Sequence, residues 1–148
     1  MDELMDAAAK ISALGTDANG NKIYGLALAN SGLEASEGYN MLPILWGYGA
    51  EYQDADGKIA IASDAGIQAY TAIQNLYVND ISPKGASFKD IRNLFGQGVI
   101  GFYWDAEAGL SPCASAAPDK DAFYAKVGAM PIPANDSPNG YGYLSERY

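Results

Sequence analysis

Apolar residues recur at helical spacing in two long stretches of this chain. In residues 2–14 the apolar side chains follow one another at intervals of three and four, which predicts an amphipathic helix that ends at Gly15. The same spacing, with Ser63 as N-cap, predicts a second helix over residues 64–78. The predicted buried stripe of this second helix consists of Ile67, Tyr70, Ile73, Leu76 and Tyr77.

Shorter helices are indicated by residues that favour the start of a helix. Pro43 lacks an N–H and therefore suits the first turn of a short helix. Ser87 and Asp90 have the spacing of a capping box, which predicts a helix over residues 88–95. Further short helical pieces are expected in residues 105–116, together with a loop, and in residues 121–125.

Three apolar runs predict strands. Residues 23–29 and 99–104 are almost wholly apolar, as is typical of buried strands in a parallel or mixed sheet. Residues 127–132 predict a last strand, which Pro131 and Pro133 push towards an edge. Because helices and strands alternate along the chain, the sequence predicts an α/β fold, a layered sheet flanked by helices.

Turn residues fill in the rest of the expected architecture. Residues 51–61 predict a small hairpin around the turn at 54–57, since Asp-Gly suits tight turns. The stretches 17–21 and 54–57 are acidic enough to suggest calcium loops, but they lack the glycine and glutamate that an EF-hand needs, and turns are expected there. With 148 residues, the chain is expected to form a single domain over residues 1–148.

Composition and charge exclude several classes of function. A net charge of −9 without a basic segment argues against a nucleic-acid partner. The absence of histidine removes His-dependent catalytic arrangements and His-ligated zinc, and the single cysteine, Cys113, forms neither an internal disulfide nor a multi-thiolate zinc site. Neither a metal nor another cofactor is expected. The chain contains no signal-peptide pattern and no run of about 18 apolar residues that would span a membrane.

Tyrosine is the most informative component of the composition. The chain has eleven tyrosines and two tryptophans. Those expected in or beside loops are Tyr39, Trp46, Tyr48, Tyr52, Tyr103, Trp104, Tyr141 and Tyr143. Aromatic rings flanked by carboxylates and amides are typical of carbohydrate sites, where ring faces cover the C–H patches of a sugar and polar groups take its hydroxyls. The alternative interpretation is that these are ordinary half-buried aromatic residues.

Asp105 and Glu107 directly follow the predicted strand 99–104. In open α/β sheets, ligands gather outside the carboxyl ends of strands, which makes these side chains candidates for hydrogen bonds to a ligand. Two other interpretations are an acid and base pair for catalysis and ordinary solvated surface charge.

Several segments, read in order, resemble one family. The most distinctive are LPILWGYG at 42–49, LFGQGVIGFY at 94–103 and KVGAMPIP at 126–133, preceded by the helix at 2–8 and by NKIYGL at 21–26. The hairpin and helix at 56–77 lie between them. Together these segments are similar to the extracellular solute-binding proteins of bacterial ABC sugar importers, the group that includes maltose-binding protein.

The resemblance implies a two-lobed protein with a type II periplasmic-binding-protein fold, in which ligand binds between the lobes. By this resemblance the chain covers mainly part of the C-terminal lobe. The expected ligand is a sugar, and the expected partner of the full-length parent is an ABC permease at an extracellular or periplasmic location, associated with the membrane. A homodimer through the surface left by the missing lobe is also expected.

The resemblance also indicates ligand-binding residues. Tyr39, Asn40 and Trp46 match the segment that commonly faces the cleft. After the strand that ends at Tyr103, Asp105 fits the family's acidic position, whereas the stacking tryptophan of the family is absent, and Trp104 is expected to substitute for it. The segment that stands where the family has Gly, Pro and Trp consists of Ala106, Glu107 and Ala108.

The predicted function is therefore that of a carbohydrate-binding lobe, and not an enzyme, with Trp46 and Trp104 as stacking platforms and Asp105 and Glu107 as hydroxyl acceptors. One alternative is a glycoside-processing enzyme domain that uses Asp105 and Glu107. Another is a structural or interaction domain that binds no sugar.

Overall fold

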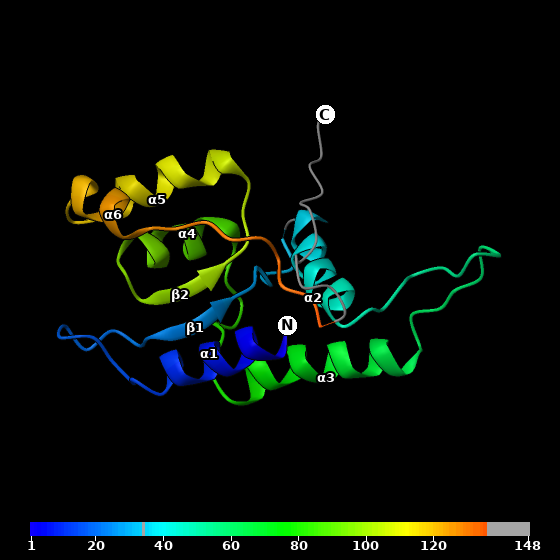
Figure 1. The fold of residues 1–148 in the computed structure, drawn as a ribbon. Coiled ribbons are helices and arrows are strands. Elements are labelled where there is room, and N and C mark those ends of the chain that lie inside the picture. The colour runs from blue at the N-terminus through cyan, green and yellow to red at the C-terminus, as the bar shows by residue number, and fades with distance from the viewer. Residues whose placement is uncertain (34, 136–148) are drawn as a thin grey trace.

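A computed structural model describes residues 1–33 and 35–135 of the chain. A single parallel pair of strands lies between two groups of helices in this part of the chain (Figure 1). The elements in chain order are α1 (Asp2–Ser12), β1 (Tyr24–Ala27), the 3-10 helix η1 (Ala35–Asn40), α2 (Leu42–Gly47), α3 (Asp64–Val78), α4 (Phe88–Gly96), β2 (Ile100–Tyr103), the 3-10 helix η2 (Glu107–Gly109), α5 (Leu110–Ala116) and α6 (Lys120–Lys126).

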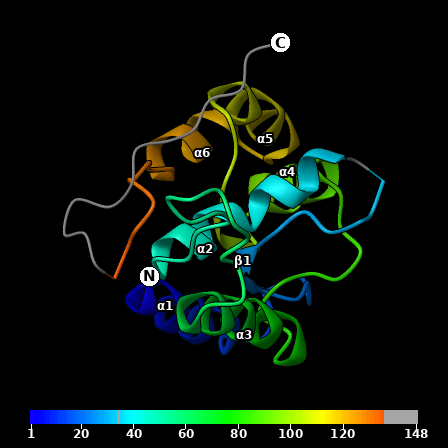
Figure 2. The ribbon, with the colours of Figure 1, turned by 90° about the vertical axis from the view of Figure 1, so that its right-hand side faces the viewer.

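The helices lie on both sides of the sheet. In both views α1 and α3 lie side by side on one side, and α4, α5 and α6 lie on the other (Figures 1 and 2). The α/β fold with a sheet flanked by helices is therefore confirmed. No helix in the described ranges has the length and hydropathy that crossing a bilayer requires.

The two strands pair in parallel, with Leu26 opposite Phe102 and Ala27 opposite Tyr103. The hydrophobic core has two parts around them. The larger part lies among α1, β1, α2 and α3, and the smaller part lies between the strands and α4. Fully buried side chains of these two parts include Leu26, Leu28, Ile44, Leu45, Leu76 and Ile91.

Two glycines in the strands allow α1 to approach the sheet closely. A Cβ atom at Gly25 would lie 1.8 Å from the carbonyl oxygen of Ala8, and one at Gly101 would lie 2.7 Å from the side chain of Ile11. Any larger residue at Gly25 would therefore collide with the backbone of the helix.

The helix boundaries follow the capping residues of the sequence. Ser63 accepts a hydrogen bond from the Gly66 N–H and begins α3, as predicted. Ser87 and Asp90 form the predicted capping box at the start of α4. Pro43 lies in the first turn of α2, where its missing N–H leaves no helical hydrogen bond unmade.

The predicted buried stripe of α3 is partly wrong. Ile73 and Leu76 are buried and Tyr77 is half-buried, but 59% of Ile67 and 45% of Tyr70 are exposed, and Ala69 is buried instead. The first half of α3 extends beyond the end of α1 (Figure 1), and among the described residues Ile67 and Tyr70 stay largely exposed there.

Two predicted β elements do not form as strands. Residues 51–61 project from the body and make an isolated antiparallel bridge between Gln53 and Ile59 around the expected turn. Residues 127–132 form no strand either and make a bridge at Ile132 alone, since Pro131 within the segment and Pro133 directly after it offer no N–H to a ladder. The strands expected at 23–29 and 99–104 do form, with shorter bounds, and β2 is only partly buried.

Candidate functional site

The carboxyl ends of β1 and β2 meet at one edge of the sheet because the strands are parallel. Beyond β1 the chain continues to η1, which carries Tyr39 and Asn40. Beyond β2 come Trp104 and then Asp105, followed by η2. The fold therefore brings two of the three separate segments that carry the predicted site residues to the same edge.

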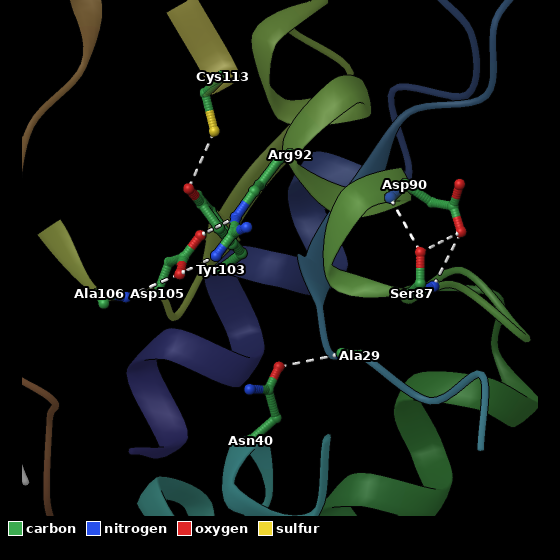
Figure 3. Close-up of polar contacts among 9 residues, drawn as sticks. All are labelled: Ala29, Asn40, Ser87, Asp90, Arg92, Tyr103, Asp105, Ala106 and Cys113. Atoms are coloured by element: carbon green, nitrogen blue, oxygen red, sulfur yellow. Dashed lines mark hydrogen bonds and ion pairs between the residues drawn. The ribbon is translucent and has the colours of Figure 1, made fainter. Parts of the chain in front are cut away.

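Asn40 connects the two strand ends. Its side-chain oxygen accepts a hydrogen bond from the N–H of Ala29 at 2.9 Å (Figure 3), and its main-chain oxygen accepts one from the indole N–H of Trp104 at 2.9 Å. The residue is buried, with 6% of its surface exposed. Asn40 is therefore part of the frame that holds Trp104 in place.

The indole N–H of Trp104 is engaged by the Asn40 carbonyl, so the ring, and not the N–H, is the part of this side chain that is free for other contacts. The ring is partly buried and packs against the larger part of the core. A half-buried aromatic face at the carboxyl end of a strand is suited to cover the C–H face of a sugar.

Asp105 is held by two parallel hydrogen bonds from Arg92 of α4. The Nε atom of Arg92 donates to Oδ2 of Asp105 at 2.7 Å, and the terminal Nη2 atom of Arg92 donates to Oδ1 at 2.9 Å (Figure 3). The N–H of Ala106 donates to Oδ1 at 2.8 Å. The hydrogen bond with Asp105 raises the pKa of the Arg92 guanidinium further above its usual value.

The Asp105 carboxylate is also enclosed by the following turn. A Cβ atom at Gly109 would lie 1.9 Å from Oδ2, so only glycine fits beside the carboxylate. The side chain of Asp105 is 9% exposed. Three of the acceptor positions of this carboxylate are therefore filled within the chain, and little of it faces solvent.

The side chain of Tyr103, the last residue of β2, points towards α5. Its hydroxyl lies 3.0 Å from the thiol sulfur of Cys113, and its ring packs against Phe95 with centroids 4.7 Å apart. Burial raises the pKa of the Tyr103 hydroxyl and that of the Cys113 thiol above their ordinary values. Both groups stay protonated at neutral pH and form a structural contact.

A groove of about 740 Å³ runs along β2 and the loop after it. Trp104, Asp105 and Glu107 line one side, and the segment 126–133 lines the other. Glu107 is exposed, unlike Asp105. Glu107 is thus the carboxylate of this pair that is accessible to a ligand.

The remaining predicted residues are less closely connected to this groove. Tyr39 lies on η1 with 46% of its surface exposed. Trp46 lies at the end of α2, partly buried, and is not among the residues that line the groove. Tyr141, Tyr143 and the rest of the chain after residue 135 lie outside the described residues.

Glu37 was missed by the sequence analysis. Its carboxylate is almost fully buried at the end of β1, where it accepts hydrogen bonds from the Ser31 hydroxyl and, at 2.7 Å, from the Gly32 N–H. In the sequence Glu37 lies in a polar stretch with no apolar period, so nothing there distinguishes it from a solvated charge. The Glu37 carboxylate is therefore engaged within the loop between β1 and η1 and holds that loop in place.

The two acidic loops form turns, as predicted. Asp17 accepts hydrogen bonds from the N–H groups of Asn19 and Asn21, and Asp54 does the same for Asp56 and Lys58. Within residues 1–33 and 35–135, no group of three or more acidic or cysteine side chains is placed to hold a metal ion.

Comparison with known proteins identifies relatives by sequence and one similar solved structure. The chain is 29% identical over 136 residues to proteins of Brucella abortus (strain 2308) and Brucella suis biovar 1 (strain 1330) that are named as binding proteins, without a ligand in the name. These alignments cover 90% of this chain and 30% of each Brucella protein. The maltose-bound MalE3 structure from T. maritima superposes with a TM-score of 0.66 at 26% identity, over 90% of this chain and 32% of MalE3.

The chain thus spans about a third of the length of the relatives it matches. The sequence profile of bacterial extracellular solute-binding proteins matches residues 1–144, which is nearly the whole chain. Proteins of this family bind solutes and do not transform them, in agreement with the prediction that the chain is not an enzyme. The chain belongs to the bacterial extracellular solute-binding protein family.

Proposed function

We propose that this chain is a carbohydrate-binding lobe of a solute-binding protein and that the sugar binds at the carboxyl ends of β1 and β2. The observation that carries the proposal is the half-buried ring of Trp104, fixed through its N–H to Asn40, beside a groove that Glu107 also lines. The maltose held by the T. maritima neighbour supports a sugar as the class of ligand.

The residues of the site have different roles in this proposal. Trp104 covers the apolar face of a sugar ring, and Glu107 accepts hydrogen bonds from its hydroxyls. Tyr39, exposed on η1, and Trp46 on α2 do not line this groove, and in this proposal they contact parts of a sugar that extend beyond it. Asn40 and Tyr103 hold the frame of the site, because their polar atoms are engaged within the chain.

Asp105 is poorly placed for catalysis. Its two oxygens are engaged by Arg92 and by the Ala106 N–H, and only 9% of the side chain is exposed, so the carboxylate is not free to reach a scissile bond. This observation favours binding over the glycoside-processing alternative that the sequence left open.

We further propose that the chain forms part of the C-terminal lobe of a two-lobed protein that delivers sugar to an ABC permease outside the cytoplasm, in an extracellular or periplasmic location. In such a protein the second lobe supplies the other half of the cleft. The chain alone is expected to bind sugar weakly, since one lobe covers only part of the ligand.

The test is the thermal midpoint of the chain with and without a large excess of maltose and other oligosaccharides. A ligand that binds only the folded state raises this midpoint by mass action. Trp104→Ala should abolish the increase and Trp104→Phe should retain part of it. The control is Tyr124→Ala, which removes an exposed aromatic residue of α6 and should leave the increase unchanged.

If none of the sugars raises the midpoint of the wild-type chain, the proposed site is wrong. It is also wrong if a sugar raises the midpoint of Trp104→Ala by the same amount.

A further inference from the structure

Three consecutive residues at the end of β2 connect to three different elements. Tyr103 contacts Cys113 of α5, Trp104 donates its N–H to Asn40 of η1, and Asp105 pairs with Arg92 of α4. Trp104 lies between the two flanking anchors. A change in either anchor would therefore shift the backbone on which the indole ring is carried.

Arg92 is itself held in place. Its guanidinium carbon lies 5.8 Å from the centroid of the Phe88 ring, one helical turn earlier on α4. Its Nε atom and a terminal nitrogen meet the two oxygens of Asp105 side by side. A planar guanidinium held in this way fixes both the position and the orientation of its carboxylate partner.

Asp105 in turn organises the loop that follows. Its Oδ1 atom accepts the Ala106 N–H, and its Oδ2 atom lies where a side chain at Gly109 would be. The carboxylate thus fills the centre of the turn from 105 to 109 and attaches this turn to α4.

From these contacts we infer that Arg92 is a positioning residue for the sugar site: through Asp105 it fixes the loop that carries Trp104 and Glu107. The inference deepens the proposed function and rests on it for the identity of the ligand. In this account Asp105 acts within the frame of the site, and Trp104 and Glu107 contact the sugar.

The chain offers a direct probe of this inference, because Trp46 and Trp104 are its only tryptophans. In a Trp46→Phe background, acrylamide quenching of the remaining fluorescence reports the exposure and mobility of the Trp104 ring. Arg92→Met retains the aliphatic stem but removes the paired donors, and it should increase this quenching. Asp105→Asn should increase the quenching to the same extent. Quenching in the double variant, Arg92→Met with Asp105→Asn, should not exceed that in either single variant, because the pair acts as a unit.

The matched control is Lys84→Met, which breaks an ion pair to Asp80 of similar length, 2.9 Å, on the exposed surface. It should change neither the quenching nor the binding of sugar. Circular dichroism and the thermal midpoint identify any variant that fails to fold. For such a variant, Arg92→Lys provides a milder change that keeps the charge but loses the paired geometry.

The second readout is affinity for maltose, measured by isothermal titration calorimetry with Trp46 retained, because the proposed function places Trp46 in the sugar site. Arg92→Met should weaken binding by roughly 2- to 30-fold, as expected for residues that act on a site without touching the ligand. Unchanged quenching and unchanged affinity in a folded Arg92→Met variant would overturn the inference. If the wild-type chain bound no maltose, the proposed function would be in question for that sugar, while the quenching comparison would still decide whether Arg92 positions Trp104.

Discussion

At the scale of single residues, the site depends on which polar atoms are already engaged within the chain. Tyr103 is the last residue of β2, and Asn40 and Asp105 lie beyond the ends of β1 and β2; in the sequence all three are plausible ligand contacts. The structure shows that each is hydrogen-bonded to a neighbouring element. Glu107, by contrast, is exposed beside Trp104. Sequence position identifies the edge of the sheet, but only the contacts separate framework residues from binding residues.

The contact between Tyr103 and Cys113 predicts a pH dependence of stability. Burial raises the pKa of both groups in the folded state, so the unfolded chain loses these protons at lower pH than the folded chain. The stabilisation they provide is therefore complete below the ordinary thiol pKa of 9.0 and declines as the pH rises above it.

The free energy of unfolding, measured by urea denaturation between pH 7 and pH 10, should thus fall with pH. Cys113→Ala should make the fall shallower. The same slope in both proteins would show that the thiol contributes nothing to the pH dependence.

Native Cys113 should also react slowly with a thiol reagent such as DTNB at pH 8. The side chain is fully buried and its raised pKa keeps it protonated, whereas the thiolate is the reactive form. Addition of urea above the unfolding midpoint should restore the rate of a free thiol. Fast labelling of the native chain would contradict the buried position of Cys113.

At the scale of elements, sequence signals identified the helices well where capping residues were present. Ser63 and Ser87 begin α3 and α4 at the predicted positions because a side-chain oxygen satisfies a free N–H of the first turn. The strand at 127–132 and the hairpin at 51–61 were predicted from local pattern alone. Strand formation needs a neighbour with which to pair, and local sequence contains no information about that neighbour.

The capping box of α4 provides a prediction about stability. Ser87→Ala should lower the free energy of unfolding by about 1 kcal/mol, since it removes the acceptor for the Asp90 N–H. Hydrogen bonds from Ser87 also hold the pKa of Asp90 below its usual value, so the pKa of Asp90 measured by NMR should rise in this variant. Ser115→Ala on α5 is the control, because its hydroxyl donates to the Ser111 carbonyl within the helix and caps no helix start. Equal losses in the two variants would contradict the capping role.

The close packing of α1 on β1 provides a second prediction about stability. Gly25→Ala should destabilise the chain by about 3 kcal/mol, because the new methyl group would overlap the Ala8 backbone. Gly128→Ala should have little effect, because no described atom beyond the two adjacent residues lies within 4 Å of the added methyl. Chemical denaturation compares the two. A Gly25→Ala variant as stable as the wild type would show that α1 does not lie against β1 as described.

At the scale of the whole molecule, the order of motifs was more informative than any single motif. The segments at 42–49, 94–103 and 126–133 are each too weak to identify a family, but their order along the chain indicated the solute-binding proteins, and the match over residues 1–144 confirms that family. The identity of the solute is not predictable from the sequence, because it depends on how side chains from separate segments meet in the folded protein.

The expected homodimer remains a prediction at this scale. It requires association through an apolar surface, so sedimentation velocity at two protein concentrations should show a species that grows with concentration. A monomer at both concentrations would remove this expectation without affecting the sugar site.

The most direct measurement of the central claim is an NMR titration of the isotopically labelled chain with maltose and a panel of related sugars. The spectrum should contain two indole N–H signals, one for each tryptophan, and Trp46→Phe assigns them. Binding at the strand ends predicts that at least one sugar shifts the Trp104 indole signal in a saturable manner, even if the affinity of one lobe is weak. A Trp104 signal that stays in place with every sugar, up to the solubility limit of each, would contradict a carbohydrate site at the carboxyl ends of β1 and β2.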